Sequence, residues 1–220
     1  MQYSYRRLKL WMRTYYRRHG LKPRKGFSVR SNKWGRPAQL MWQEVCKREK
    51  VPVTLKPTDA NINLIRPFRM RLKRRIEIEL GTKEWPAFSN WGEVKKYLAA
   101  AGIGFPAPWC AAFVTYCVMR AGWKQGLPAK PAWVPSWESW AKARGYEVAK
   151  LRARKGDIVT FNWDADPAGE HIGFIARNYG AYKSVATIEG NATSSALPGG
   201  GVVRKLRRWS QVNHVYRLPN

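Results

Sequence analysis

The feature that most constrains the fold is a change in hydrophobic spacing near Lys155. Before that point, apolar residues follow helical spacing, as in residues 5–18 and 109–121. After it, short apolar runs are separated by turns, which is typical of β-strands. Helices followed by an antiparallel meander predict an α+β fold, with helices packed on an antiparallel sheet. The expected strands cover residues 157–163, 171–178, 183–189, 202–208 and 215–218.

Charge divides the chain unevenly. Its 220 residues include 41 Lys and Arg against 14 Asp and Glu, a formal net charge of +27. Residues 1–80 carry 22 basic and 5 acidic side chains, net +17, and residues 81–220 carry 19 and 9, net +10. Glycine, alanine and tryptophan increase after Leu80, so we expect a basic, mainly helical N-terminal region at 1–80 and a separate domain at 81–220. Such a charge attracts polyanions, namely nucleic acid, anionic lipid or anionic wall polymers.

The basic region is expected to contain two helices. Residues 5–18 form an amphipathic pattern with Leu8 and Met12 on its apolar side. This helix either packs on its own domain or binds a surface through its arginines. A second helix is expected at residues 37–50, opening on a proline. Residues 51–75 are expected to be irregular, with a solvated basic cluster formed by Arg69, Arg71, Lys73, Arg74 and Arg75.

The cysteines and the apolar segments limit the compartment. Cys46, Cys110 and Cys117 form no CxxC pair, which argues against a disulfide framework or a Cys-rich zinc site and favours a reducing compartment. The N-terminus has no long apolar segment, so we expect no secretory signal peptide. Residues 98–119 are uncharged, but two glycines and two prolines interrupt them, so we expect no membrane span there.

Cys110 is the candidate nucleophile. It is expected in the first turn of the helix at 109–121, where unpaired backbone N–H groups and the helix dipole stabilise a thiolate. Cys117, two turns deeper on the same face, is expected to be an inert core residue. A cysteine at a helix start more often packs than reacts, so the assignment needs a nearby base.

His171 is the candidate base. The chain has three histidines, and the other two lie in the basic arm, at His19, and close to the C-terminus, at His214. His171 opens an apolar strand with the sequence HIGFIA. A base at the mouth of a strand can face a helix start across a cleft, which is the geometry needed for proton transfer from a thiol.

Two sets of side chains can bind the imidazole. The next expected strand ends in TIEGNAT, whose Glu189 and Asn191 lie on the same face if the strand continues. Either can orient the ring, which is the third role in a catalytic triad. The alternative is a histidine that only stabilises the preceding turn. Its partners there would be Asp164, Asp166 or Glu170.

Several motifs together resemble a known family. The segments PWCAAFVTYCVMRAG, KGDIVTFNW with HIGFIA, and TIEGNAT followed by GGGVV resemble the CHAP family of cysteine, histidine-dependent amidohydrolases/peptidases, particularly its phage lysin form. The resemblance spans residues 81–218 and implies a papain-like fold with Cys110 as nucleophile and His171 as general base. It further implies that Glu189 and Asn191 support the histidine; we expect Asn191 as the main orienting residue and Glu189 as a helper, although the sequence does not separate the two. The implied substrate is an amide bond of bacterial peptidoglycan, next to N-acetylmuramic acid or within the peptide stem and cross-bridge.

The chain departs from some relatives beside the nucleophile. They carry a side-chain amide just before the cysteine, where this chain has Trp109. An oxyanion hole would then use the Cys110 backbone N–H and a second donor, for which Asn90 is the candidate. The candidate substrate contacts are Trp109, Asn90 and Trp163. No acidic loop of the calcium-binding type precedes Cys110, so we expect no required metal and no cofactor.

The leading hypothesis is a bacteriophage endolysin that stays in the host cytoplasm until it is released to the cell wall. Its basic region would contact anionic wall polymers or a membrane surface. One alternative is a lysin built into the virion, docked on phage virion proteins. Another is a basic nucleic-acid-binding protein with an inactive hydrolase-like domain, but residues 1–80 contain no recognised nucleic-acid motif, so nucleic acid is the less favoured partner.

Overall fold

The computed structural model describes residues 5–30, 32–49, 51–58, 67–163, 169–180 and 183–220. The chain divides into two compact units, Met1–Arg66 and Pro67–Asn220. None of the helices in the described part of the chain has the length and hydropathy required of a membrane span.

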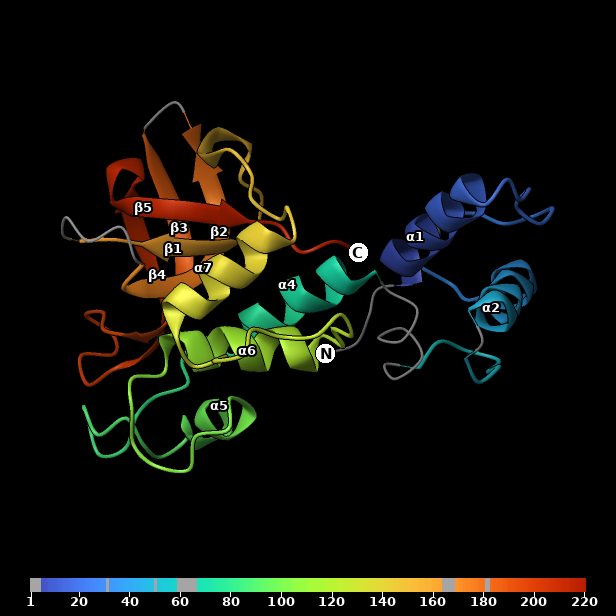
Figure 1. Ribbon diagram of the computed structural model, residues 1–220. Coiled ribbons are helices and arrows are strands. Elements are labelled where there is room, and N and C mark those ends of the chain that lie inside the picture. The colour runs from blue at the N-terminus through green and yellow to red at the C-terminus, as the bar shows by residue number, and fades with distance from the viewer. Residues whose placement is uncertain (1–4, 31, 50, 59–66, 164–168, 181–182) are drawn as a thin grey trace. The chain divides into compact units, whose positions relative to one another are not determined.

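Among the described residues, the first unit contains two helices, α1 (Tyr5–Arg18) and α2 (Arg36–Arg48) (Figure 1). The predicted bounds of α1 are confirmed, and α2 has a proline in its first turn, where the fixed φ of proline suits a helix start. The apolar face of α1 packs on α2, so the interpretation that α1 packs on its own unit is confirmed. The buried residues of this small core are Leu8, Met12, Tyr15, Tyr16, Met41, Trp42, Val45 and Cys46.

The second unit contains a five-stranded antiparallel sheet in the order β4-β3-β2-β1-β5. Consecutive strands from β1 to β4 are neighbours, and β5 returns to pair with the free edge of β1. This arrangement confirms the α+β, papain-like fold predicted from the sequence. The strands are β1 (Ile158–Phe161), β2 (His171–Tyr179), β3 (Ser184–Ala192), β4 (Gly201–Arg208) and β5 (Val212–Tyr216).

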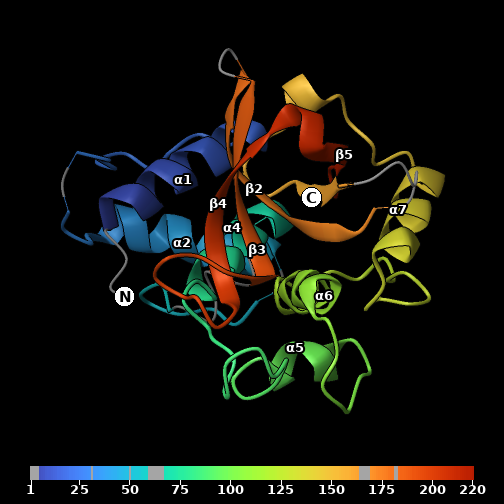
Figure 2. The same cartoon turned by 90° about the vertical axis from the view of Figure 1, so that its left-hand side faces the viewer.

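Helices lie on one side of this sheet, in contact with it or behind α6. They are α4 (Phe68–Ile78), α5 (Lys95–Ala100), α6 (Cys110–Arg120) and α7 (Val134–Ala143). α6 contacts β2 and β3, and Figures 1 and 2 both show α5 on the side of α6 that faces away from the sheet. Because it lies between these layers, α6 is buried almost all round, including Phe113, whose ring meets Phe174 of β2 edge-on.

The strands also bury their other face. Side chains that alternate with those facing α6 form a second apolar cluster, which includes Val159, Phe161, Ile175 and Val185. Two short 3₁₀ helices, η1 (Lys150–Arg152) and η3 (Trp209–Gln211), adjoin this side. β1 and the first half of β2 are therefore enclosed on both faces. This packing holds the ends of these strands, which carry polar residues, in place.

The boundary between the units lies at Pro67 rather than near Gly81. Residues 68–78, whose first part was expected to be irregular, form helix α4 of the second unit. Phe68, Leu72 and Ile76 recur at helical spacing and enter the main core. Arginines separate these apolar residues, which is why the segment looks like a solvated basic stretch in the sequence.

The basic cluster of α4 is not a solvated face. Arg69 donates a hydrogen bond of 2.5 Å from its guanidinium to Asp157, which has no exposed side-chain surface. Arg75 pairs with the buried carboxylate of Glu79 at 3.0 Å. The guanidinium of Arg71 lies against Gly122. These contacts explain why so many cations lie on a helix that faces the core.

Helix α5 begins only at Lys95, because Asn90 and Gly92 adopt positive φ angles of 54° and 80°. α7 was not predicted, since its tryptophans follow a run of prolines. Trp137 of α7 is fully buried and donates to the carbonyl of Pro131, so α7 belongs to the core rather than to an exposed groove.

Candidate active site

Cys110 is the first residue of α6. No side chain caps this end of the helix, so the N–H groups of its first turn can stabilise an anion that lies beside them. The cysteine keeps 8% of its surface exposed, whereas Cys117 is fully enclosed. Burial raises the pKa of the Cys117 thiol well above its usual value, so this second cysteine stays protonated, as expected for an inert core residue.

Trp109 anchors the start of α6 instead of contacting substrate. Its ring is fully buried and stacks on Tyr97, with 5.3 Å between the ring centroids. Its indole Nε1 donates a hydrogen bond of 2.9 Å to Glu84. The prediction that Trp109 binds substrate is wrong, because a side chain without exposed surface cannot contact a polymer.

Glu84 is a buried residue of the site that the sequence did not predict. One of its oxygens accepts from Trp109, and the other accepts a hydrogen bond of 2.6 Å from the backbone N–H of Asn90. The carboxylate therefore holds the Asn90 turn against the residue that precedes the nucleophile. The oxyanion contact of the Asn90 side-chain amide stays a prediction. The only hint in the sequence is an acidic residue within the aromatic loop EWPAFSN.

His171 is the first residue of β2 and pairs with Phe161 of β1. Its Nε2 lies 3.1 Å from a carboxylate oxygen of Glu189. The Cys110 thiol lies close enough to the imidazole to help raise the pKa of His171. Because Nε2 faces Glu189, Nδ1 is the nitrogen left for the thiol. The structure thus brings together the candidate nucleophile, the candidate base and an acidic partner.

Glu189, and not Asn191, contacts the imidazole. Both residues lie in β3, but the pairing of β3 with β4 shifts after Glu189, and Asn191 has a positive φ of 56°. Side chains stop alternating at such an irregularity, so two positions two residues apart no longer share a face. The expectation that Asn191 is the main orienting residue is therefore corrected in favour of Glu189.

Glu189 is saturated with hydrogen bonds. It has no exposed surface, and besides His171 it accepts a bond of 2.5 Å from the Thr187 hydroxyl. Arg207 of β4 donates to both of its oxygens, from Nε at 2.9 Å and from Nη2 at 2.6 Å. This two-point arrangement is the strongest form of an arginine–carboxylate pair. Arg207 was not predicted, because it lies in a strand with the basic sequence RKLRR.

The neighbouring charges shift the pKa values of the base and the acid in opposite directions. Burial by itself would lower the pKa of His171, but contact with Cys110 and Glu189 outweighs it and raises the pKa to about 9. Burial would raise the pKa of Glu189, but the bonds from Arg207 and His171 lower it to about 2. At neutral pH the site holds an imidazolium beside a carboxylate.

Residues 102–191 match the family model of the CHAP domain. This segment of the chain is similar to a CHAP domain. The matched segment includes α6, β1, β2 and β3, and with them Cys110, His171 and Glu189. The comparison with curated proteins finds no match. A match to this family indicates a hydrolase of the amidase and peptidase type that acts on peptidoglycan.

Trp163 is an accessible aromatic side chain beside the polar groups of the CHAP domain. It is 45% exposed, and its ring stacks on Phe161 with 5.4 Å between centroids and an angle of 6°. The same ring lies 6.5 Å from the imidazole of His171. Of the three predicted substrate contacts, Trp163 is the most exposed, and its role stays a prediction.

The acidic turn before β2 does not provide the partner of His171 among the described residues. Glu170 instead accepts a hydrogen bond of 2.6 Å from the backbone N–H of Trp163. Asp164 and Asp166 lie outside the described residues. Within the ranges that the structure covers, no three His, Cys, Asp or Glu side chains group to hold a metal ion.

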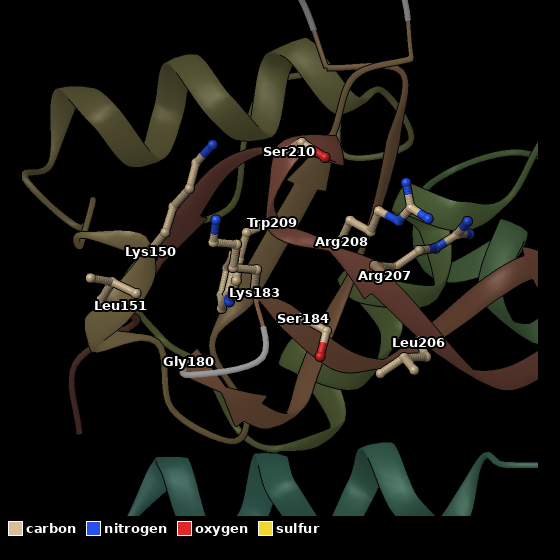
Figure 3. Close-up of a pocket in the computed structure, with 10 residues that line it drawn as sticks. All are labelled: Lys150, Leu151, Gly180, Lys183, Ser184, Leu206, Arg207, Arg208, Trp209 and Ser210. Carbon is tan, nitrogen blue, oxygen red and sulfur yellow. The ribbon is translucent and has the colours of Figure 1, made fainter.

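A pocket of about 820 Å³ lies elsewhere on the CHAP domain, between η1 and the end of β4 (Figure 3). Its lining includes Leu151, Leu206 and Trp209, but none of Cys110, His171 and Glu189. Arg207 is at its margin, and Figure 3 shows this side chain extending away from Lys150 and Leu151. The pocket is therefore separate from the residues that carry the chemistry.

The two shifted pKa values predict how stability depends on pH. A folded pKa of about 9 instead of 6.5 means that the stabilisation from His171 is complete below pH 6.5 and is lost as the pH rises toward 9. For Glu189, with about 2 instead of 4.5, stabilisation is complete above pH 4.5 and is lost toward pH 2. Urea denaturation at about pH 6 and about pH 9.5 should therefore show the wild type losing about 3 kcal/mol more than His171→Gln. Equal losses in the two proteins would contradict the assignment.

Proposed function

We propose that this protein is a bacteriophage endolysin whose CHAP domain cleaves an amide bond of peptidoglycan through a Cys110 acyl-enzyme. The observation that carries the proposal is the chain of contacts from Cys110 to His171 to Glu189 within a CHAP domain. A nucleophile, a base and an orienting acid in mutual contact are what nucleophilic acyl transfer requires. A scaffold without activity would have no need to hold a buried carboxylate ionised beside a histidine.

The proposed reaction has two halves. The Cys110 sulfur bonds to the carbonyl carbon of the scissile amide, and the electrons of the carbonyl move onto its oxygen. When this tetrahedral intermediate collapses, the C–N bond breaks, and His171 gives its proton to the departing amine. Water then attacks the thioester while His171 takes up a proton from it, and the freed acid leaves Cys110 as a thiolate.

The backbone around Cys110 supports stabilisation of the oxyanion. The Cys110 N–H begins α6, whose first turn has no side-chain cap, and the helix dipole adds to its positive field. We assign the side-chain amide of Asn90 as the second donor, because Glu84 binds both the Asn90 turn and Trp109, the residue before the nucleophile. Trp163 would contact the sugar or peptide on the side of His171.

Digestion of purified peptidoglycan tests the function and identifies the bond. The soluble fragments are analysed by mass spectrometry, with undigested walls as the blank. A freed lactyl group identifies an amidase acting next to N-acetylmuramic acid, and a new amino terminus within the peptide identifies an endopeptidase. Walls from several bacterial types that yield neither product would rule out the proposed activity.

The first unit supports attachment to anionic wall polymers. A groove of about 520 Å³ runs along α1, and four of its residues, Leu10, Arg13, Thr14 and Arg17, follow the spacing of one helix face. This face is opposite the one buried on α2. Among the described residues, Arg13, Arg17 and Lys22 of the groove have no acidic partner within ion-pair distance. Unneutralised cations beside the apolar Leu10 suit a phosphate-bearing chain with aliphatic links.

Reversing two of these charges should weaken wall binding. Arg13→Glu/Arg17→Glu is expected to lower affinity for purified walls by at least about tenfold at low salt, since each cation near an anionic surface contributes about 1 kcal/mol. The difference should shrink as salt is added. Lys124→Glu/Lys130→Glu, which reverses two exposed charges of the second unit, is the charge-matched control. Equal loss in both double variants in a pull-down assay would show that net charge, not the groove, governs binding.

A free endolysin and a virion-associated lysin would be found in different places. A free endolysin would accumulate in the host cytoplasm before release to the wall, whereas a virion-associated lysin would be present in purified particles, bound to virion proteins. We favour the endolysin, because a polyanion-binding groove serves an enzyme that must find its wall after release. Immunoblotting of purified particles distinguishes the two. Affinity for DNA without turnover of walls would instead support the nucleic-acid-binding alternative.

A further inference from the structure

Arg207 lies between the accessible aromatic surface of the site and its buried carboxylate. On one side it donates to both oxygens of Glu189, at 2.9 and 2.6 Å. On the other, its guanidinium lies 4.8 Å from the ring of Trp163 and 5.4 Å from that of Phe161. The side chain is only 19% exposed. Two hydrogen bonds and two aromatic rings therefore fix its planar head in one place.

Glu189 is a carboxylate without exposed surface, and a buried anion is destabilising unless a cation lies against it. Among the described residues, the titratable and charged groups that face the imidazole and the carboxylate are Cys110 from α6, Glu189 from β3 and Arg207 from β4, with the neutral Thr187 hydroxyl beside them. Arg207 supplies the cation, and it lies in the strand next to the one that carries Glu189.

Removing the arginine changes the protonation of the site in a defined direction. A cation within about 4–6 Å lowers the pKa of an acid by about 1–3 units, so its loss makes every anion of the cluster harder to form. The Glu189 carboxylate then takes up a proton at a higher pH, and His171 loses the acceptor that orients it.

We propose that Arg207 is a positioning residue that keeps Glu189 ionised and aligned under His171, and so sets the lowest pH at which Cys110 reacts. The proposal rests on the nucleophile and base assigned under the proposed function. It gives a role to a residue beyond the segment matched to the CHAP family, since Arg207 follows residue 191. It also explains why Trp163 is held flat against Phe161 and Arg207 at the edge of the site.

The rate of Cys110 alkylation by iodoacetamide, measured against pH, tests this role without using a wall substrate. Cys46 and Cys117 are fully buried, and mass spectrometry assigns the alkylated cysteine. In Arg207→Met the acid limb of the profile should move to higher pH by about 1–3 units, and wall hydrolysis should fall by roughly tenfold or more. Arg207→Lys keeps the charge but not the two-point bond, so its acid limb should stay near that of the wild type while hydrolysis falls.

Arg204→Met is the matched control, because Arg204 lies on the same strand and forms an exposed ion pair with Glu77. This variant should leave both the alkylation profile and the rate of wall hydrolysis unchanged. The proposal would be overturned if Arg207→Met folds and shows the same alkylation profile and the same rate of hydrolysis as Arg204→Met. If Arg207→Met does not fold, Arg207→Lys decides, and wild-type hydrolysis in that variant would overturn it. A shifted alkylation profile in a protein that cleaves no walls would uphold Arg207 and refute only the substrate.

Discussion

Replacing Cys110 by alanine is expected to reduce peptidoglycan hydrolysis by at least about a thousandfold while leaving the fold intact. The thiol supplies the atom that forms the acyl-enzyme, and removal of a nucleophile from a catalytic triad costs several powers of ten in rate. Cys110 is the first residue of its helix and is only 8% exposed, so removal of its sulfur should lower the free energy of unfolding by no more than about 1 kcal/mol. Release of new amines from purified walls and circular dichroism measure the two quantities.

Cys117→Ala provides a matched control for this prediction. It makes the same substitution in the same helix, but at a fully buried thiol. Hydrolysis should stay within about twofold of the wild type, while stability falls by about 1 kcal/mol because a small cavity is left. Retained hydrolysis in Cys110→Ala would contradict the assigned nucleophile. So would loss of hydrolysis in a folded Cys117→Ala.

Replacing Asp157 by alanine is expected to destabilise the second unit by about 3–5 kcal/mol. This carboxylate has no exposed surface and binds Arg69 of α4 at 2.5 Å and Arg217, after β5, at 2.7 Å. It also accepts a hydrogen bond of 2.8 Å from the backbone N–H of Arg154. Removing it leaves two partly buried guanidinium groups without a counter-ion, and three segments lose their common contact. Guanidinium chloride denaturation measures the change.

Glu77→Ala is the comparison for the loss of a carboxylate at the surface. Glu77 pairs with Lys155 and Arg204, both of which are about half exposed. Solvent screens these pairs, so the variant should lose less than about 1 kcal/mol. Equal losses in Asp157→Ala and Glu77→Ala would show that burial of Asp157 contributes nothing to the unit.

The elements that carry the nucleophile and the base were predictable because their signals are local. The bounds of α1 follow from apolar spacing within one segment, and the start of α6 follows from the prolines before Cys110. His171 begins β2 where the acidic turn ends and the apolar run starts. In each case the residues that determine the structure are neighbours in the chain, so periodicity and turn chemistry suffice.

The sequence analysis favoured Asn191 over Glu189 as the residue that orients His171, and hydrophobic periodicity cannot reveal why this is wrong. Asn191 and Glu189 share a face only in a regular strand, and the irregularity at Asn191 depends on how β3 pairs with β4. The ring of Trp109 was likewise predicted to meet substrate, but Tyr97 and Glu84 enclose it from other segments. Packing between distant segments decides both outcomes.

Residues whose roles depend on long-range ion pairs were missed altogether. In the sequence, α4 is a run of arginines between prolines, and only the fold places Arg69 against Asp157. Arg207 appears as one cation among several in β4, and its two bonds to Glu189 require the β3–β4 pairing. In a chain with so many basic residues, the sequence alone does not distinguish cations with a structural role from cations that are merely exposed.

The Glu84 carboxylate has a consequence for chimeric enzymes assembled by exchanging catalytic modules. A graft cut at residues 102 and 191, the limits of the family match, would leave Trp109 without its acceptor and would omit the strand that carries Arg207. The grafted segment would contain the nucleophile and the base but not the groups that hold them in position. Recombination junctions at Pro67 and after β5 keep α4, the Glu84 loop and β4 together, so Pro67–Asn220 is the exchangeable cassette.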